Sequence, residues 1–301
     1  LTGLSVILYS MLGGIRAVVW TDTIQAFILI TGALICAVYI TLSMPGGAGQ
    51  VFSIGASNGK FSLGSFGTSL SESTFWVVLV YGLFINLQNY SIDQNYIQRY
   101  MTTGSDREAK KSALFGSLLY LPVSMLFFYI GTALFAFYTA QPGRLAEELR
   151  PVSAGDRVFP YFIVHELPAG LTGLLIASIF AAGMSTISTS LNSTATIVLT
   201  DYFRKFAKRD PAEKASMRIL YAATAATGFA GTAIALALTG VESVLDAWWA
   251  LASIFSGGML GLFLLGFLPV KAGKTEAVIG VTAGIIVIVW MSLSPLLPDN
   301  G

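Results

Sequence analysis

Charged side chains, cysteine and histidine are all scarce in this sequence. Only 11% of the 301 residues are Asp, Glu, Lys or Arg, whereas about 25% are charged in a typical soluble domain. The single cysteine, Cys36, excludes an intramolecular disulfide. His165 is the only histidine and has no cysteine near it, so we expect no His/Cys metal site and assign it no role. The net charge of +1 gives no reason to expect a nucleic-acid partner.

The same scarcity argues against an intramembrane enzyme. One cysteine, one histidine and no HExxH pattern leave little from which to build a nucleophile with its base or a metal cluster. We therefore expect no enzymatic activity, no catalytic residue and no organic cofactor.

Long apolar runs dominate the sequence instead. Hydrophobic residues make up 54% of the chain and the mean hydropathy is +0.72, and a helix needs about 20 apolar residues to cross a bilayer. The composition predicts an all-α integral membrane protein that crosses the plasma membrane several times and has the lipid bilayer as a partner. We predict seven complete spans and part of an eighth, at residues 17–42, 74–97, 112–138, 169–200, 216–238, 244–268 and 275–297, with the partial one at 1–12.

The basic residues predict the orientation of these spans. Lys and Arg are retained on the cytoplasmic side, and all but four of the 17 fall in one set of alternating loops. The loops at 43–73 and 139–168 are therefore external, and the basic stretch at 201–215 is a cytoplasmic loop that also meets lipid headgroups. The apolar, proline-bounded part of the second external loop predicts a helix at the membrane interface. The four external basic residues are Lys60, Arg144, Arg150 and Arg157.

Hydroxyl side chains are concentrated in one predicted span. Nine of the sixteen residues from 185 to 200 are Ser or Thr. At about 100° per residue, Ala182, Ser185 and Thr186 share one helix face, and Ser188 and Thr189 continue it in a neighbouring direction. Two interpretations stay open. Small hydroxyl residues let membrane helices pack closely, and their hydroxyl and carbonyl oxygens also suit a hard cation such as Na⁺.

Asp22 is an acidic residue near the cytoplasmic end of the span at 17–42. Carboxylates at membrane depth are costly and are usually functional, so Asp22 is a candidate cation ligand at a depth comparable to that of Ser188. The alternative is that Asp22 caps the start of its helix, with Gln25 as its partner in a capping box.

Four segments, in this order and at these separations, carry a family resemblance. "YSMLGGIRAVVWTDTIQ", "DQNYIQRY", "STSLNSTATIVLTDYF" and "SGGMLGLFLLGF" resemble the sodium:solute symporter family. The resemblance implies the leucine-transporter-like fold of two inverted five-helix repeats, with ion and substrate sites at the membrane midplane. It further implies that residues 1–301 form a single transmembrane domain. This domain would hold the end of core helix four, core helices five to ten and one further helix, as part of a longer polypeptide.

The resemblance also implies two sodium sites and no other metal. Ala182, Ser185 and Thr186 match the main sodium site of the family, and Asp22, Ser185, Ser188 and Thr189 match an additional site found in some members. In the sugar cotransporters alanine can stand at the position of Ser188, so a hydroxyl here favours two sodium ions per transport cycle.

The helix around "YGLFINLQNYSIDQNYIQRY" is too polar to face lipid, so we expect it to line a cavity. Its substrate candidates are Asn86, Asn89 and Asp93, although Asn86 has the alternative of a hydrogen bond between helices. By the resemblance, Asn86 matches a sugar contact. Asn89, Tyr120 and Trp249 instead replace the gate tyrosine, the substrate-binding lysine and a glutamine of the glucose-type members.

These observations predict a secondary active transporter that couples inward sodium movement to uptake of a small polar solute by alternating access. The three replaced positions argue against a hexose site of the familiar kind. An organic anion such as sialic acid stays open, as do sugar-like and amino-acid-like solutes. The alternative is that a symporter-like domain serves as the membrane sensor of a signalling protein.

Overall fold

The computed structural model describes residues 2–70, 72–207, 212–239, 252, 258–269 and 273–293. Within these ranges every secondary-structure element is helical. The chain divides into two compact units. The first comprises Leu1–Phe75 and Thr102–Phe229, and the second comprises Trp76–Met101 and Ala230–Gly301.

The first unit holds the longest helices. They are α1 (Thr2–Leu42), α2 (Gly47–Ser57), α5 (Asp106–Ala140), α6 (Gly155–His165), α7 (Ala169–Ile197), the π-helical η4 (Val198–Arg204), α8 (Lys205–Ala207) and most of α9 (Glu213–Ala237). Three short 3₁₀ turns join α5 to α6, at Pro142–Arg144 (η1), Glu147–Leu149 (η2) and Val152–Ala154 (η3). The second unit holds α3 (Phe75–Ile92, except its first residue), α4 (Gln94–Tyr100) and α11 (Lys274–Leu293).

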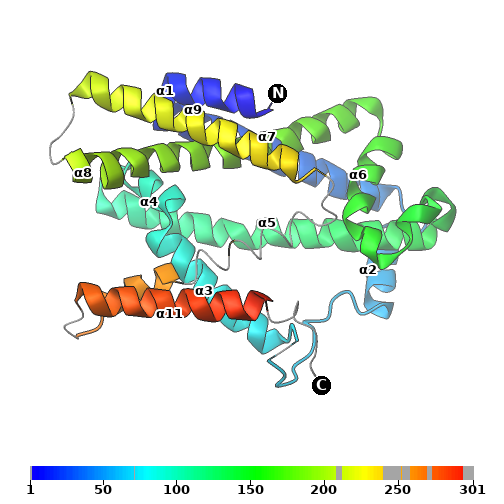
Figure 1. Cartoon of the computed structure of the whole chain (residues 1–301). Helices are drawn as coiled ribbons and strands as arrows, with labels where there is room; N and C mark the ends of the chain where they lie inside the picture. The colour runs from blue at the N-terminus through cyan, green and yellow to red at the C-terminus, as the bar shows by residue number, and fades with distance from the viewer. Residues whose placement is uncertain are drawn as a thin grey trace. The chain divides into compact units, whose positions relative to one another are not determined.

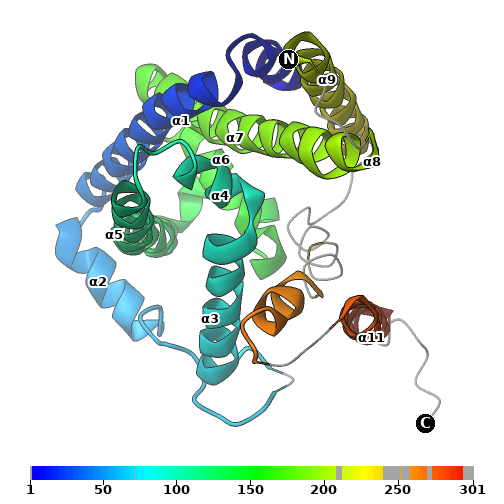
Figure 2. The same ribbon diagram turned by 90° about the vertical axis from the view of Figure 1, so that its left-hand side faces the viewer.

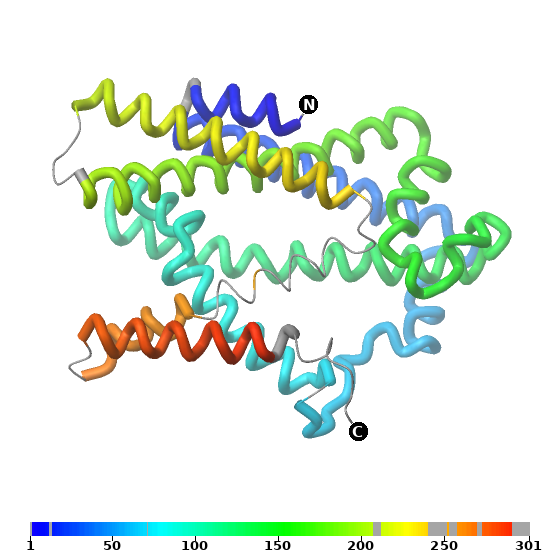
Figure 3. The backbone as a smooth tube through the Cα atoms, viewed as in Figure 1, coloured from blue at the N-terminus to red at the C-terminus, as the bar shows by residue number. Residues whose placement is uncertain are grey.

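Helix α1 is two helices joined at Gly14. Gly14 has φ 52° and ψ −150°, a conformation that is essentially restricted to glycine. Figure 3 shows the tube turning sharply between the two segments. The break separates the apolar run predicted at 1–12 from the span predicted to begin at residue 17, so the sequence placed this boundary correctly.

The core of the first unit lies where α1, α5, α6 and α7 meet. α1 and α7 make the most extensive contact, and they lie side by side in Figures 1 and 2. Phe162 of α6 is fully buried and meets the edge of Phe137 at 5.5 Å between ring centroids. The helix predicted to lie at the interface is therefore packed into the core through one face.

Five helices among the described residues are long and apolar enough to cross a membrane, namely Gly14–Leu42, Phe75–Ile92, Asp106–Ala140, Ala169–Arg204 and Glu213–Ala237. They match five of the predicted spans to within a few residues at most ends. The span predicted at 275–297 is helical over Lys274–Leu293. Most of the span predicted at 244–268 lies outside the described residues.

Two of the predicted loops contain helices. The Gly- and Ser-rich segment at 43–73 contains helix α2, because Val51 is fully buried in the core cluster and tertiary packing overrides weak helix propensity. The cytoplasmic loop predicted at 201–215 is helical at 201–207 and again from 213. The first of these helices continues past the apolar run because no glycine or proline interrupts residues 184–210.

Candidate cation and substrate sites

The residues predicted for the main sodium site lie within α7. The Thr186 hydroxyl donates a hydrogen bond of 3.2 Å to the Ala182 carbonyl oxygen. These two candidate ligand oxygens are therefore close enough to contact the same ion. Ser185 precedes Thr186 on the same helix, three residues after Ala182. Thr186 is exposed and Ser185 is half-buried. A hydroxyl bonded to the carbonyl four residues earlier is also ordinary for Thr inside a helix, so this bond alone does not identify a cation site.

The residues predicted for the second site come together from two helices. The Thr189 hydroxyl of α7 lies 3.2 Å from Oδ2 of Asp22 on α1. The Ser188 hydroxyl donates to the Ser185 carbonyl oxygen at 3.0 Å and is fully buried. A carboxylate, hydroxyls and a carbonyl therefore gather on facing sides of α1 and α7. These are oxygen donors of the kind that hard cations take.

Asp22 does not cap a helix. It lies well inside the segment of α1 that follows Gly14, so the capping-box alternative with Gln25 is wrong. Gln25 is instead one turn further along, on the same face as Asp22. Its Oε1 atom is buried and makes no hydrogen bond with the part of the chain that is described. Sequence reasoning missed this oxygen because the D-x-x-Q spacing has a simple local explanation.

Close packing fixes how α1 faces α7. An added Cβ at Gly32 would lie only 2.6 Å from the Ser178 hydroxyl oxygen. Ser178 is buried and donates to the carbonyl oxygens of Ile28 on α1, at 3.2 Å, and Leu174 on its own helix, at 2.8 Å. A lone glycine in an apolar span is a signal for such close approach.

A second contact holds α7 beside the candidate site. The Tyr9 hydroxyl, from the first segment of α1, donates to the Met184 carbonyl oxygen at 3.3 Å. Met184 lies between Ala182 and Ser185 in sequence, so this contact sits among the candidate ligands. Nothing in the sequence around Tyr9 indicates this role, because the partner is 175 residues away.

The substrate candidates are distributed over both units. In the second unit, Asp93 separates α3 from α4 and caps α4, accepting a hydrogen bond from the Asn95 backbone N–H at 2.7 Å. Asn86 donates to the Gly82 carbonyl oxygen of its own helix at 2.7 Å, and Asn89 is half-buried. Tyr120, in the first unit, is 67% exposed. Trp249 lies outside the described residues.

Two further features bear on the expected chemistry. Within the described ranges, no group of three or more His, Cys, Asp or Glu side chains is placed to hold a metal ion.

Residues 55–59 match the GxSxG pattern, whose serine in hydrolases lies on a turn between a strand and a helix. Here the pattern ends helix α2, and Ser57 donates to the Ile54 carbonyl oxygen.

His165 lies at the end of α6 and contacts Tyr161. Its ring stacks on Tyr161 at 4.0 Å between centroids, and its Nδ1 lies 3.0 Å from the Tyr161 carbonyl oxygen. The adjacent Glu166 forms an ion pair of 2.7 Å with Arg144 and accepts a bond from Tyr39 through its carbonyl oxygen at 2.9 Å. These contacts tie the segment predicted to be an external loop to α1 and α5.

The chain as a whole matches a known family. The model of the sodium:solute symporter family matches residues 1–284. The chain is 35% identical to the sodium/sialic acid symporter NanT of Aliivibrio fischeri over 97% of the chain, and 34% identical to SiaT of Proteus mirabilis over 96%. The human sodium-coupled monocarboxylate transporter 1 is 28% identical over 99% of the chain. The alignments cover 57%, 58% and 49% of these relatives, so the chain spans about half their length.

A solved structure agrees with the sequence relatives. A Na⁺-coupled sialic acid symporter, in a substrate-bound outward-open state described as revealing a novel Na⁺ site, superposes with a TM-score of 0.87 at 32% identity. The match covers 99% of this chain and 66% of that one. The expected fold, an all-α membrane protein of the leucine-transporter type, is confirmed. The chain belongs to the sodium:solute symporter family.

Proposed function

We propose that the protein is a sodium-coupled symporter that takes up a small organic solute by alternating access. The observation that carries this proposal is the meeting of Asp22 and Thr189 at 3.2 Å between α1 and α7. Family membership supports it, since the relatives are named as sodium symporters and sodium-coupled transporters. The several apolar helices make it a multi-pass membrane protein, and we propose the plasma membrane as its location.

The main sodium ion would bind at Ala182, Ser185 and Thr186. The Thr186 hydroxyl donates a hydrogen bond to the Ala182 carbonyl oxygen. Rotation of this hydroxyl would free a lone pair on each of the two oxygens for an incoming ion, at the cost of one hydrogen bond, about 1 kcal/mol. The ion replaces that bond with two charge–dipole contacts, which favours binding.

A second sodium ion would bind at Asp22, Ser185, Ser188 and Thr189. The Asp22 carboxylate attracts the ion, and this attraction offsets the free energy that the ion loses when it leaves water for a buried site. Ser188 and Thr189 are both at least 94% buried, so an ion there is screened little by salt. Two ions moving inward across about 100 mV gain about 4.6 kcal/mol, and the entry of a monovalent anion costs about 2.3 kcal/mol of this. The voltage alone therefore supports roughly fiftyfold accumulation of such an anion.

For the solute, we propose an organic anion of the size of sialic acid. The two relatives with the highest identities given above are named for sialic acid, and another is named for monocarboxylates. Asn86, Asn89, Asp93, Tyr120 and Trp249 remain the candidates for solute contacts. The sensor alternative has no support among these relatives, whose names describe transport.

Uptake by the full-length protein in proteoliposomes tests this function. We expect sialic acid to accumulate with an inward sodium gradient and to fail to accumulate when potassium replaces sodium. A panel with a monocarboxylate, a vitamin carboxylate and glucose separates the solute class from the coupling ion. Equal uptake of every solute in sodium and potassium would refute the symporter assignment.

A further inference from the structure

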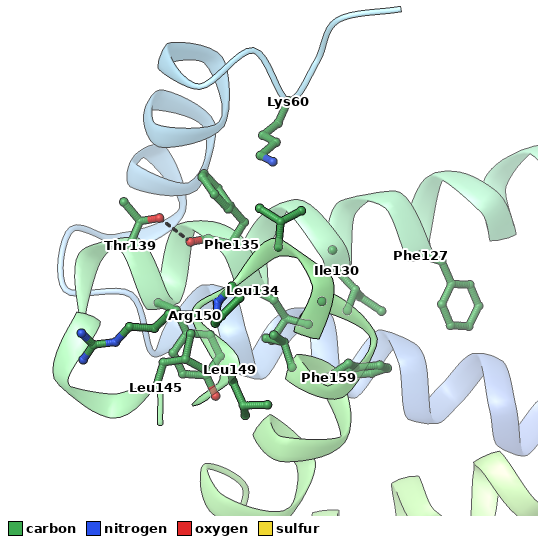
Figure 4. Close-up of a pocket in the computed structure, with 16 residues that line it drawn as sticks. Lys60, Phe127, Ile130, Leu134, Phe135, Thr139, Leu145, Leu149, Arg150 and Phe159 are labelled. Carbon is green, nitrogen blue, oxygen red and sulfur yellow. Dashed lines mark hydrogen bonds between the residues drawn. The ribbon is translucent and has the colours of Figure 1, made fainter. Parts of the chain in front are cut away.

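A cavity of about 530 Å³ lies in the first unit, away from the candidate sodium site. It is bounded by the C-terminal half of α5 on one side and by the segment from Leu145 to Phe159 on the other (Figure 4). Its volume is in the range of pockets that hold drug-sized ligands. None of the candidate residues for sodium or solute lines it.

Most of the cavity wall is apolar. Side chains of α5 that recur every three or four residues form one wall, and side chains around η2, η3 and α6 form the other. Phe127 and Thr139 are twelve positions apart on α5, which is about 18 Å at helical rise. The cavity therefore suits a molecule with a long apolar part. The apolar wall includes Phe127, Ile130, Leu134, Leu149, Val158 and Phe159.

The charge of the cavity is positive. Its lining includes Lys60 and Arg150 and no acidic side chain. Lys60 reaches over the α5 wall, with Nζ 4.1 Å from the centroid of the Phe135 ring (Figure 4). Arg150 points away from Lys60 in the same view, and it donates to the Pro142 carbonyl oxygen and lies 4.0 Å from Glu147. Lys60 is thus the cation that faces the apolar wall.

We propose that this cavity binds an amphipathic anion, with its apolar chain along α5 and its carboxylate or phosphate at Lys60. An anionic lipid of the outer leaflet and a free fatty acid share this chemistry. Binding here is separate from sodium and solute binding, since no residue is shared.

Fluorescence of a dansylated undecanoic acid tests the proposal on full-length protein in phosphatidylcholine nanodiscs. We expect saturable binding, a roughly tenfold rise in Kd for Lys60→Met, and retained binding for Lys60→Arg, because one charge-assisted contact is worth about that factor. Gly131→Leu should abolish binding by filling the cavity. Gly131 lines the cavity, and an added Cβ there meets nothing within 4 Å.

Gly116→Leu is the matched control, because Gly116 is also on α5, has equal room for a Cβ and does not line the cavity. It should bind like the wild type. Adding phosphatidylglycerol to the nanodiscs identifies the source: competition with the probe indicates a lipid, and no competition indicates a free fatty acid. Absence of saturable binding, or equal Kd values for wild type, Lys60→Met and Gly131→Leu, would overturn the proposal.

Discussion

Gly32 of α1 faces Ser178 of α7 so closely that a Cβ at residue 32 would lie 2.6 Å from the serine hydroxyl oxygen. The same contact region includes the Ser178 bond to the Ile28 carbonyl oxygen. Asp22 lies ten residues before Gly32 on α1, and it meets Thr189, which lies eleven residues after Ser178 on α7. The spacing between the helices at Gly32 therefore helps to set the distance across the candidate sodium site.

The first prediction concerns this close approach. Gly32→Ala should destabilise the protein by about 1–3 kcal/mol through overpacking and should weaken apparent sodium affinity. Ser178→Ala in the same chain should restore part of both, because it removes the oxygen 2.6 Å away. Thermal unfolding and sodium-dependent uptake measure the two effects. Gly173→Ala is the control, because a Cβ at this position of α7 meets nothing within 4 Å. If the effects of Gly32→Ala and Ser178→Ala are additive in the double variant, the two residues are not in direct contact.

The second prediction concerns the main sodium site. Thr186→Ala removes one proposed ligand and should raise the half-saturating sodium concentration severalfold, since a ligand of this kind is worth about 1 kcal/mol. Thr196→Ala is matched to it, because Thr196 makes the same bond to the carbonyl four residues earlier, at 2.8 Å, outside the proposed site. If both variants change sodium affinity equally, or neither does, Thr186 is a packing residue.

The third prediction concerns the second sodium site. Asp22→Asn keeps an oxygen that can accept from Thr189 but removes the charge. It should lower the sodium Hill coefficient of transport from near two towards one, and Ser188→Ala should do the same. The double variant should add little, because both changes act on one site. An unchanged Hill coefficient in both single variants, at equal expression, would leave one coupled sodium ion.

The fourth prediction concerns the buried Gln25 oxygen. Gln25→Leu keeps the approximate volume and removes the polar group. We expect Oε1 to face the ion bound at Asp22. Gln25→Leu should then lower sodium affinity severalfold, whereas Gln25→Glu, which keeps an oxygen at this position, should not lower it. A chain that becomes more stable, with unchanged sodium affinity, would show that Gln25 is only an unpaired buried group. Thermal unfolding with and without sodium distinguishes the two results.

Local patterns account for the successful part of the sequence analysis. Five spans follow from apolar runs that a helix must bury in lipid, and the boundary at Gly14 follows from the gap between two such runs. The face shared by Ala182, Ser185 and Thr186 follows from helical periodicity. Helix α2 and the end of η4 at residues 201–204 were missed, because neither is an apolar run long enough to predict a span.

The sequence by itself determined the class of protein, its helices and the set of oxygen donors, since all of these depend on residues close together in the chain. Only the tertiary structure decided which donors meet. Asp22 could have capped its own helix, and its place beside Thr189 depends on a contact between residues 167 apart. The contacts of Gly32 with Ser178 and of Tyr9 with Met184 join the same two helices. Such packing depends on the shapes of distant side chains, which no local pattern encodes.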